Sequence, residues 1–460
     1  MEQVEFLRTF GNAIRRRRAA VFVGAGVSMS SGFPSWDDLV GPLRDAANVP
    51  TTVRDATVAA EYAVQELKMD EVERLLLSKL DGFQSSSNDV VEELLSIDFA
   101  EIWTTNFDTL LETADPNLDL VLEDDDYENT SPLRARRLTK LHGSLGEAPD
   151  GTTNWRSHPV ITRSSFESFE REHPLKWAML RAQFLTSSFL FLGFSFADPN
   201  VGALLRIVRS LPAKIRRLPH FAIMKPPSET DERREFALFC RDLTAAGVHV
   251  VEIENYEDLP GLLRSLARSA LPPNVFVSGT VDDDSDAKRT CTATGVMLAG
   301  LSEDLAIFSF DGSASRAVSS AYKTSLRPEA YSPERIRAFY RKSPTGEDTI
   351  TVPRFGTAVF TEKSLEEMRS DVLSRVRVML LLGGSGRTQE EAELALSKGI
   401  PVIPFGGSNG AAQAIWERGR VVCGFASDEA EHPWGLLSHQ EPSIAAGAAK
   451  ELLEMVLPSS

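Results

Sequence analysis

Asn106, Asp108 and His142 are the side chains of this sequence best suited to catalysis on a polar ligand. The asparagine amide can both donate and accept, which suits sugar hydroxyls or a carboxamide. The aspartate can accept from a hydroxyl or stabilise a developing cation, and the histidine can exchange a proton because an imidazole titrates near neutrality. Taken singly, an asparagine after a strand most often caps a turn or helix, and a His-Gly pair is most often an ordinary turn.

The segments that carry these residues all follow apolar runs that predict buried strands. In an open parallel sheet the carboxyl ends of the strands meet at one edge, where such sheets bind their ligands. Glycines in these segments allow a phosphate to approach the backbone, and the amides that enter the next helix attract an anion. Four such segments in one sheet indicate a dinucleotide site, although a lone glycine turn would not. They are Gly24-Ala25-Gly26-Val27-Ser28, Thr104-Thr105-Asn106-Phe107-Asp108, Leu141-His142-Gly143-Ser144 and Gly193-Phe194-Ser195-Phe196-Ala197-Asp198.

The elements that position these segments alternate between strands and helices, which predicts a doubly wound parallel sheet of the Rossmann-like α/β class. The strands are expected at 19–23, 102–105, 118–122, 138–141, 189–192, 221–224 and 248–253. Helical spacing covers 4–14, 36–43, 56–80, 231–246 and 256–270.

Leu271-Pro272-Pro273 interrupts this alternation, and a second one begins at Asn274. We therefore predict two domains, residues 1–272 and 273–460, each built on a doubly wound parallel sheet. The second sheet is expected to contain strands 275–277, 305–308, 376–382 and 401–403, with helices at 365–374 and 389–397.

The second domain has its own glycine-rich loop after a buried strand, with Gly383, Gly384 and Gly386 ahead of a predicted helix. Such a loop can hold an anion, and Arg387 adds a cation where a phosphate would lie. Thr388 is also expected as the N-cap of this helix, with Glu391 completing a capping box. As a ligand contact, Glu391 suits ribose hydroxyls, because a carboxylate repels a phosphate.

Composition limits the remaining possibilities. The formal net charge of −17 argues against a nucleic-acid partner, which needs a basic surface. Cys240, Cys291 and Cys423 form no CxxC pair, so neither a zinc module nor a disulfide framework is predicted. The N-terminal residues lack the apolar core of a signal peptide, and the apolar run 189–196 is too short to cross a bilayer. We therefore expect no metal, no membrane contact and a cytoplasmic protein.

The motifs GAGVS, FPSW, TTNFD, LHGS and GFSFAD resemble, in order and spacing, the sirtuin-like NAD-binding domain over residues 6–270. The resemblance implies that Asn106 and Asp108 act near the nicotinamide ribose and that His142 acts at the ribose hydroxyls. A sirtuin deacylase has a four-cysteine zinc module and a glutamine where Thr105 stands. Their absence favours cleavage of the nicotinamide glycosidic bond with water as acceptor. The implied NAD+ contacts are Gly24, Ala25, Gly26, Ser28, Phe33, Trp36, Thr105, Gly193, Ser195 and Asp198.

The motifs VSGT, GGSGRTQEEAELA and GIPVIPFGG resemble the SLOG nucleotide-sensing fold over residues 274–457. This resemblance implies a regulatory nucleotide in the second domain, because no nucleophile or metal cluster is evident there. The implied effector contacts are Ser278, Gly279, Arg316, Arg354, Arg377, Gly383, Gly384, Gly386, Arg387, Thr388 and Glu391.

A sirtuin-like domain fused to a SLOG domain resembles the Thoeris anti-phage defence effectors. The resemblance implies an NAD+ hydrolase that releases nicotinamide and ADP-ribose, activated by a cyclic ADP-ribose isomer from a partner TIR-domain protein. It also implies abortive defence by NAD+ depletion and a homo-oligomer, a tetramer or larger. Two alternatives stay open: an NAD-dependent protein deacylase with a regulatory nucleotide domain, and a non-catalytic NAD or ADP-ribose sensor.

Overall fold

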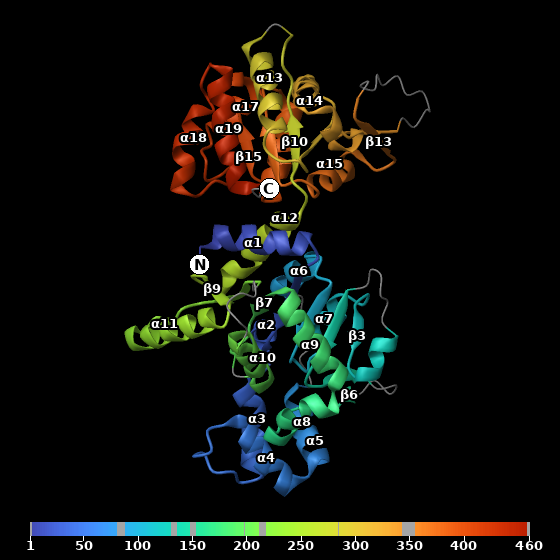
Figure 1. Cartoon of the computed structure of the whole chain (residues 1–460), viewed down its shortest axis with the longest axis vertical. Helices are drawn as coiled ribbons and strands as arrows, with labels where there is room; N and C mark the ends of the chain where they lie inside the picture. The colour runs from blue at the N-terminus through green and yellow to red at the C-terminus, as the bar shows by residue number, and fades with distance from the viewer. Residues whose placement is uncertain are drawn as a thin grey trace. The chain divides into compact units, whose positions relative to one another are not determined.

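The chain divides into two compact units, Met1–Ala270 and Leu271–Ser460 (Figure 1). The computed structural model describes residues 2–80, 88–129, 136–147, 153–196, 198–210, 218–283, 285–342 and 355–457. The division falls two residues before the predicted boundary at Pro272, at the end of helix α12 (Leu259–Ala270). It falls there because a Pro-Pro pair cannot continue a helix.

The first unit contains a seven-stranded sheet in the order β3-β4-β2-β1-β7-β8-β9, with all neighbouring strands parallel. The strand order reverses between β1 and β7, and the loops after these two strands therefore border the crevice where doubly wound sheets bind ligands. The strands are β1 (Ala19–Val23), β2 (Glu101–Thr104), β3 (Asp119–Val121), β4 (Arg137–Lys140), β7 (Ser188–Leu192), β8 (His220–Met224) and β9 (Val248–Glu252).

Helices cover both faces of this sheet, each against its own apolar cluster. Every residue of β1 and β7 is buried, as expected for central strands between two helical layers. One face packs against α1 (Gln3–Arg15), α6 (Asp89–Ser96), α7 (Leu110–Ala114) and α12. The other packs against α8 (Arg163–Glu172), α9 (Pro174–Thr186), α10 (Pro199–Ser210) and part of α11 (Thr230–Ala245).

Three further helices, α3 (Trp36–Ala46), α4 (Ala56–Leu67) and α5 (Met69–Leu80), form a helical subdomain with a separate apolar cluster. The apolar spacing of 56–80 predicts one helix, but the structure divides it at Lys68, whose φ is +64°. A residue in the left-handed region ends a helix, so this part of the prediction is wrong. The antiparallel pair β5 (Ser144–Glu147) and β6 (Thr153–Ser157) was not predicted.

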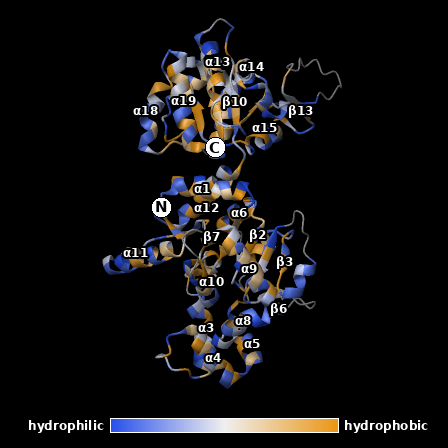
Figure 2. Cartoon of the chain, viewed as in Figure 1, coloured by the Kyte–Doolittle hydropathy of each residue, from blue (hydrophilic) through white to orange (hydrophobic). Residues whose placement is uncertain are grey.

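The second unit contains a six-stranded parallel sheet in the order β13-β12-β11-β10-β14-β15. Hydrophobic residues gather on its central strand β10 (Figure 2). The edge strand β13 and its neighbour β12 were not predicted. The strands are β10 (Asn274–Ser278), β11 (Ala306–Ser309), β12 (Ile336–Arg341), β13 (Thr357–Thr361), β14 (Val378–Leu381) and β15 (Val402–Pro404). The helices are α13 (Asp286–Ala299), α14 (Ser313–Ser325), α15 (Leu365–Leu373), α16 (Gly386–Ser397), α17 (Gly410–Trp416), α18 (Glu431–Leu436) and α19 (Pro442–Val456).

Candidate functional site

The loops after β1 and β7 touch each other through their backbones. Gly24 N donates to Leu192 O at 2.8 Å, and Gly26 N donates to Gly193 O at 2.9 Å. Gly193 has a φ of +61°, and a Cβ atom there would lie 2.5 Å from the Val27 nitrogen. The amide of Gly26, predicted to face a phosphate, is therefore engaged by the neighbouring loop. These glycines allow two loops to approach closely.

Asn106 lies in this crevice and is only 9% exposed. Its Nδ2 donates to Gly24 O at 3.1 Å and to Ser28 Oγ at 2.9 Å, which fixes the orientation of the amide. Its Oδ1 is buried and accepts no hydrogen bond from the described residues. A buried acceptor without a donor costs about 1–3 kcal/mol, so it marks a place where a ligand hydroxyl or water can bind.

The Asn106 loop is held by two residues that the sequence analysis did not identify. Thr104 Oγ1 accepts from Asn106 N at 3.0 Å and donates to Val23 O at 2.9 Å, which joins the ends of β2 and β1. Lys140 is 1% exposed; its Nζ donates to the Phe107 and Asp108 carbonyls and pairs with Glu112. A lysine within a buried strand was the only signal available in the sequence.

His142 follows β4 and is almost fully buried. Its ring lies edge-on to Phe166, with centroids 4.9 Å apart, and its Nε2 lies 3.2 Å from Asp198 Oδ2. Burial lowers the pKa of His142, the Asp198 carboxylate opposes this, and electrostatic interactions with Lys176 and His173 lower the pKa further. The imidazole is therefore neutral at pH 7 and able to accept a proton.

The other residues predicted at this site fall into different settings. Asp108 Oδ1 accepts from Leu110 N at 3.1 Å, so this carboxylate caps α7. Trp36 stacks on Phe107 with ring centroids 6.2 Å apart, and Phe33 is buried in the cluster of the helical subdomain. Ser28 is buried under Asn106, whereas Ala25 and Ser195 are exposed and Thr105 is partly buried.

Asn88 is a further residue that the sequence analysis missed. Its Nδ2 donates to Val27 O at 2.9 Å and to the hydroxyls of Ser30 and Ser31. Asn88, at the start of α6, thereby fixes the turn that follows α2 (Ala25–Met29). Nothing in its local sequence distinguishes it from an ordinary N-cap, a role that it also fills through Val90 N.

The corresponding edge of the second sheet has a similar loop-to-loop contact. Leu382 N donates to Ser278 O at 3.1 Å, and Gly384 N donates to Thr280 O at 3.0 Å. A Cβ atom on Gly279 would lie 1.8 Å from Leu382 O, so only glycine fits there. The predicted strand-end turns of β10 and β14 therefore lie side by side.

Glu391 connects these turns to helix α16. Its Oε2 accepts from Ser278 Oγ at 2.5 Å, and its Oε1 lies 3.6 Å from Arg369 Nη2, an arginine that the sequence analysis missed. Burial raises the pKa of Glu391. The hydrogen bond from Ser278 and the charges of Arg369 and Arg387 act in the opposite direction and lower it. A buried carboxylate with a raised pKa in a crevice is typical of a functional site.

The capping-box prediction for this helix is wrong. Helix α16 begins at Gly386 after the N-cap Ser385, so Thr388 lies inside the first turn, where it is buried. A Cβ atom on Gly384 would lie 2.4 Å from Thr388 Oγ1, which shows how closely the glycine loop covers it. Gly386 and Arg387 are exposed at the start of the helix.

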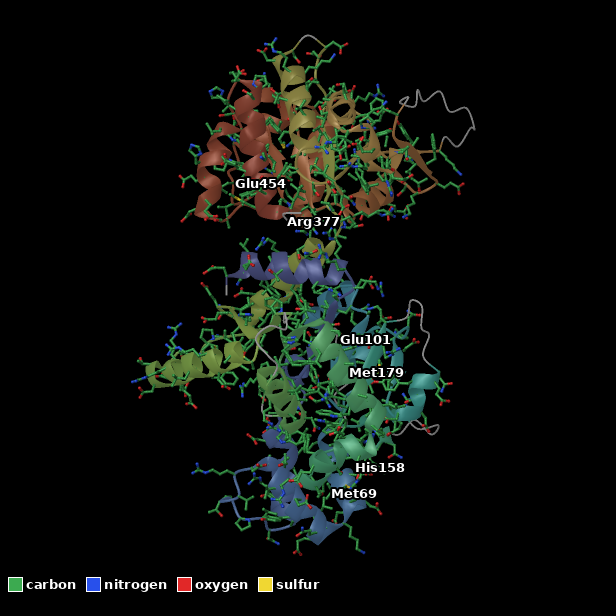
Figure 3. The ribbon with its side chains drawn as sticks, in the orientation of Figure 1. Met69, Glu101, His158, Met179, Arg377 and Glu454 are labelled. Atoms are coloured by element: carbon green, nitrogen blue, oxygen red, sulfur yellow. The ribbon has the colours of Figure 1, made fainter. Side chains whose placement is uncertain are left out.

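Two of the predicted effector arginines, Arg316 and Arg377, are not brought together. Arg316 forms a two-point contact with Asp311, at 2.8 Å and 2.5 Å, beside a small serine-lined concavity under α14. Arg377 precedes β14, at the opposite end of the sheet from the glycine loop, and its Nε donates to Leu271 O at 2.6 Å (Figure 3). It is therefore outside the candidate effector crevice. Arg354 lies outside the described residues.

The described residues contain no group of three or more histidine, cysteine or acidic side chains that could hold a metal ion. All three cysteines are free; burial raises the pKa of Cys291 to about 12 and that of Cys423 to about 11. Within the described part of the chain, no helix is both long and apolar enough to cross a membrane.

Comparison with known proteins identifies relatives of both halves of the chain. Residues 100–242 match the SIR2-like domain family. An NAD(+) hydrolase ThsA of Enterococcus faecium is 29% identical over 310 residues, which cover 62% of this chain and 62% of that protein. An NAD(+) hydrolase ThsA of Cytobacillus dafuensis is 24% identical over 446 residues, 89% of this chain and 87% of that protein.

A more distant relative is Defense-associated sirtuin 2 of Bacillus subtilis, 22% identical over 48% of this chain and 22% of that protein. Among solved structures, the X-ray structure of TM1055 is 19% identical to this chain, with a TM-score of 0.26. The match covers 32% of this chain and 81% of the TM1055 chain. This likeness is too low to inform the site. The matches to ThsA proteins extend across both units, because the longer one covers most of the chain.

Proposed function

We propose that this chain, which is similar to ThsA NAD(+) hydrolases over most of its length, hydrolyses NAD+ to nicotinamide and ADP-ribose. The observation that carries the proposal is the crevice at β1, β2 and β4, where Asn106 has a buried free acceptor and His142 is held neutral. The likeness to the SIR2-like family supports NAD+ as the ligand of this crevice.

The chemistry follows from the leaving group. Nicotinamide is bound to the ribose as a cation, so breaking the glycosidic bond returns the electron pair to the pyridine ring and leaves an oxocarbenium-like ribose. Asn106 Oδ1 would accept from a ribose hydroxyl or from the attacking water. As water adds to the ribose carbon, His142 would take the released proton. The balance is NAD+ plus water giving nicotinamide, ADP-ribose and one proton.

The second unit is proposed to sense a cyclic ADP-ribose isomer, made by a partner TIR-domain protein, in the crevice at β10, β14 and α16. The glycine turns allow phosphates to approach, Arg387 supplies an exposed cation, and Glu391 suits ribose hydroxyls. We further propose that the active form is a tetramer or larger, located in the cytoplasm, and that it depletes NAD+ during phage infection. The name of one relative, Defense-associated sirtuin 2, supports a role in defence.

The first test is nicotinamide release from NAD+ by the purified chain. We expect Asn106→Ala and His142→Ala to reduce kcat by at least about 10²-fold, the usual contribution of a positioned acid–base group. Asn117→Ala and His158→Ala are matched controls, since both side chains are exposed. Folded Asn106 and His142 variants with wild-type rates would contradict the assignment.

The same assay separates the alternative functions. Nicotinamide release that depends on an acylated peptide would indicate a deacylase. If the wild-type protein binds NAD+ or ADP-ribose but releases no nicotinamide under any condition, it is a sensor.

The second test measures NAD+ cleavage with a panel of cyclic ADP-ribose isomers. We expect one isomer to stimulate the wild type, and Glu391→Gln to lose at least tenfold of that stimulation because its ribose contact is weakened. Glu390→Gln is the matched control: it is the next residue on the same helix, it is exposed, and it also contacts Arg369. Equal loss in both variants would place the effect outside the crevice.

A further inference from the structure

Asp198 was expected to contact NAD+, but the structure places its carboxylate between a helix and His142. Oδ1 accepts from Asn200 N at 2.8 Å and from Val201 N at 3.0 Å, which caps the first turn of α10. Oδ2 lies 3.2 Å from His142 Nε2. One oxygen is therefore fixed by the helix, and the other is presented to the imidazole.

The surroundings of this pair exclude water. The His142 side chain is 3% exposed and that of Asp198 is 9% exposed. The rings of Phe166 and Phe169 are both nearly perpendicular to the imidazole, with centroids 4.9 Å and 6.3 Å away. In such a setting a carboxylate acts strongly on an imidazole, because little solvent screens the interaction.

From this geometry we propose that Asp198 is a positioning residue for His142, which sets the ring's tautomer and stabilises its protonated form during NAD+ hydrolysis. The inference rests on the proposed function. A carboxylate facing Nε2 favours a proton on that nitrogen, which leaves Nδ1 to accept the proton from the reaction. Nε2 and Oδ2 are within hydrogen-bond distance but out of line, a geometry that commonly tightens when substrate binds.

The other charged groups around the imidazole act against its protonation. Lys176, which is 1% exposed, and His173 both lower the pKa of His142, as does burial. Asp198 is the one group among the causes of this shift that favours the charged form. Without it, a proton taken by His142 would lie in an apolar site near the Lys176 ammonium. The transition state therefore depends on this carboxylate.

The test is Asp198→Asn, because asparagine also caps helices and so preserves α10. Its Nδ2 would face Nε2 as a donor, which forces the opposite tautomer and removes the acceptor at Nδ1. We expect kcat to fall by about 10²-fold or more, KM for NAD+ to change by less than about threefold, and the acid limb of the pH profile to move to lower pH. Asp55→Asn is the matched control, because Asp55 caps α4 and pairs with no histidine.

A KM increase with unchanged kcat would overturn the proposal and return Asp198 to the role of a substrate contact.

The second measurement is nitrogen NMR of the histidine side chains, with His142→Gln to assign the signal. Wild type should show His142 protonated at Nε2, and Asp198→Asn should lower its pKa. A wild-type Nδ1–H tautomer, or an unchanged pKa in the variant, would refute the pairing. The wild-type tautomer is measured without turnover and without Asp198→Asn, so it remains decisive if NAD+ cleavage itself fails or if that variant does not fold.

Discussion

At the scale of single residues, the first unit depends on buried polar side chains whose partners come from distant parts of the sequence. Lys140 and Asn106 show the two possible outcomes. The Lys140 ammonium has three acceptors and stabilises a loop, whereas the Asn106 amide keeps one acceptor free for a ligand. Buried polar groups are normally paired, so the free acceptor of Asn106 supports its proposed role in binding a ligand.

His220 gives a prediction about acid stability. Burial lowers its pKa to about 3, and its Nδ1 accepts from Phe189 N at 3.1 Å, so the folded state keeps the ring neutral. The unfolded chain binds a proton near pH 6.5, so this contribution is complete above that pH and is lost as the pH falls towards 3. The loss is at most about 1.4 kcal/mol per pH unit.

We therefore expect His220→Gln, which keeps an acceptor, to reduce the pH dependence of stability. The measurement is the melting temperature of wild type and variant between pH 7.5 and 5. Parallel curves would show that the pKa of His220 is the same in the folded and unfolded states, which would contradict this prediction.

At the scale of elements, the site is assembled by loops from strands that neighbour each other in the sheet but not in the sequence. The loop after β7 supports the loop after β1, and the latter orients Asn106 after β2. The orientation of Asn106, and with it the proposed catalytic geometry, thus depends on a contact between two glycine turns.

Gly193→Ala tests this dependence. A Cβ atom would lie 2.5 Å from Val27 N at a φ of +61°, so the loops must separate and the backbone is strained by about 1–3 kcal/mol. We expect a lower melting temperature and slower NAD+ cleavage. Gly202→Ala is the control, because nothing but the end of Arg206 lies within 4 Å of its Cβ. Equal effects of the two substitutions would contradict this view of the crevice.

At the scale of the whole molecule, each unit has its own core. The three apolar clusters of the first unit contain no residue beyond 270, and the cluster of the second contains none before 275. Because hydrophobic burial supplies most of the folding free energy, each unit should be able to fold alone.

We expect residues 1–270 to unfold cooperatively near the temperature at which that unit unfolds in the full chain, and to bind NAD+. Cleavage by this fragment should not respond to cyclic ADP-ribose isomers, because the proposed sensor is absent. Calorimetry and the nicotinamide assay check both points. A fragment that is unfolded, or that still responds to the isomers, would contradict the division of roles.

The sequence alone was sufficient to predict the two parallel sheets, because long apolar runs between glycine and proline turns form buried strands in almost any context. It also placed Asn106 and His142 at one edge of the first sheet, since residues that follow parallel strands of one sheet share an edge; their role in catalysis stays a prediction. The sequence did not predict the helix break at Lys68 or the first turn of α16, because packing overrides local propensity at both places.

Only the tertiary structure decided which of these side chains meet. It placed Arg377 at the far end of its strand, paired Asp198 with His142, and put Lys140 under the Asn106 loop. These contacts join residues up to 106 positions apart. Strand order and side-chain direction determine them, and both result from the packing of the whole domain rather than from any local pattern.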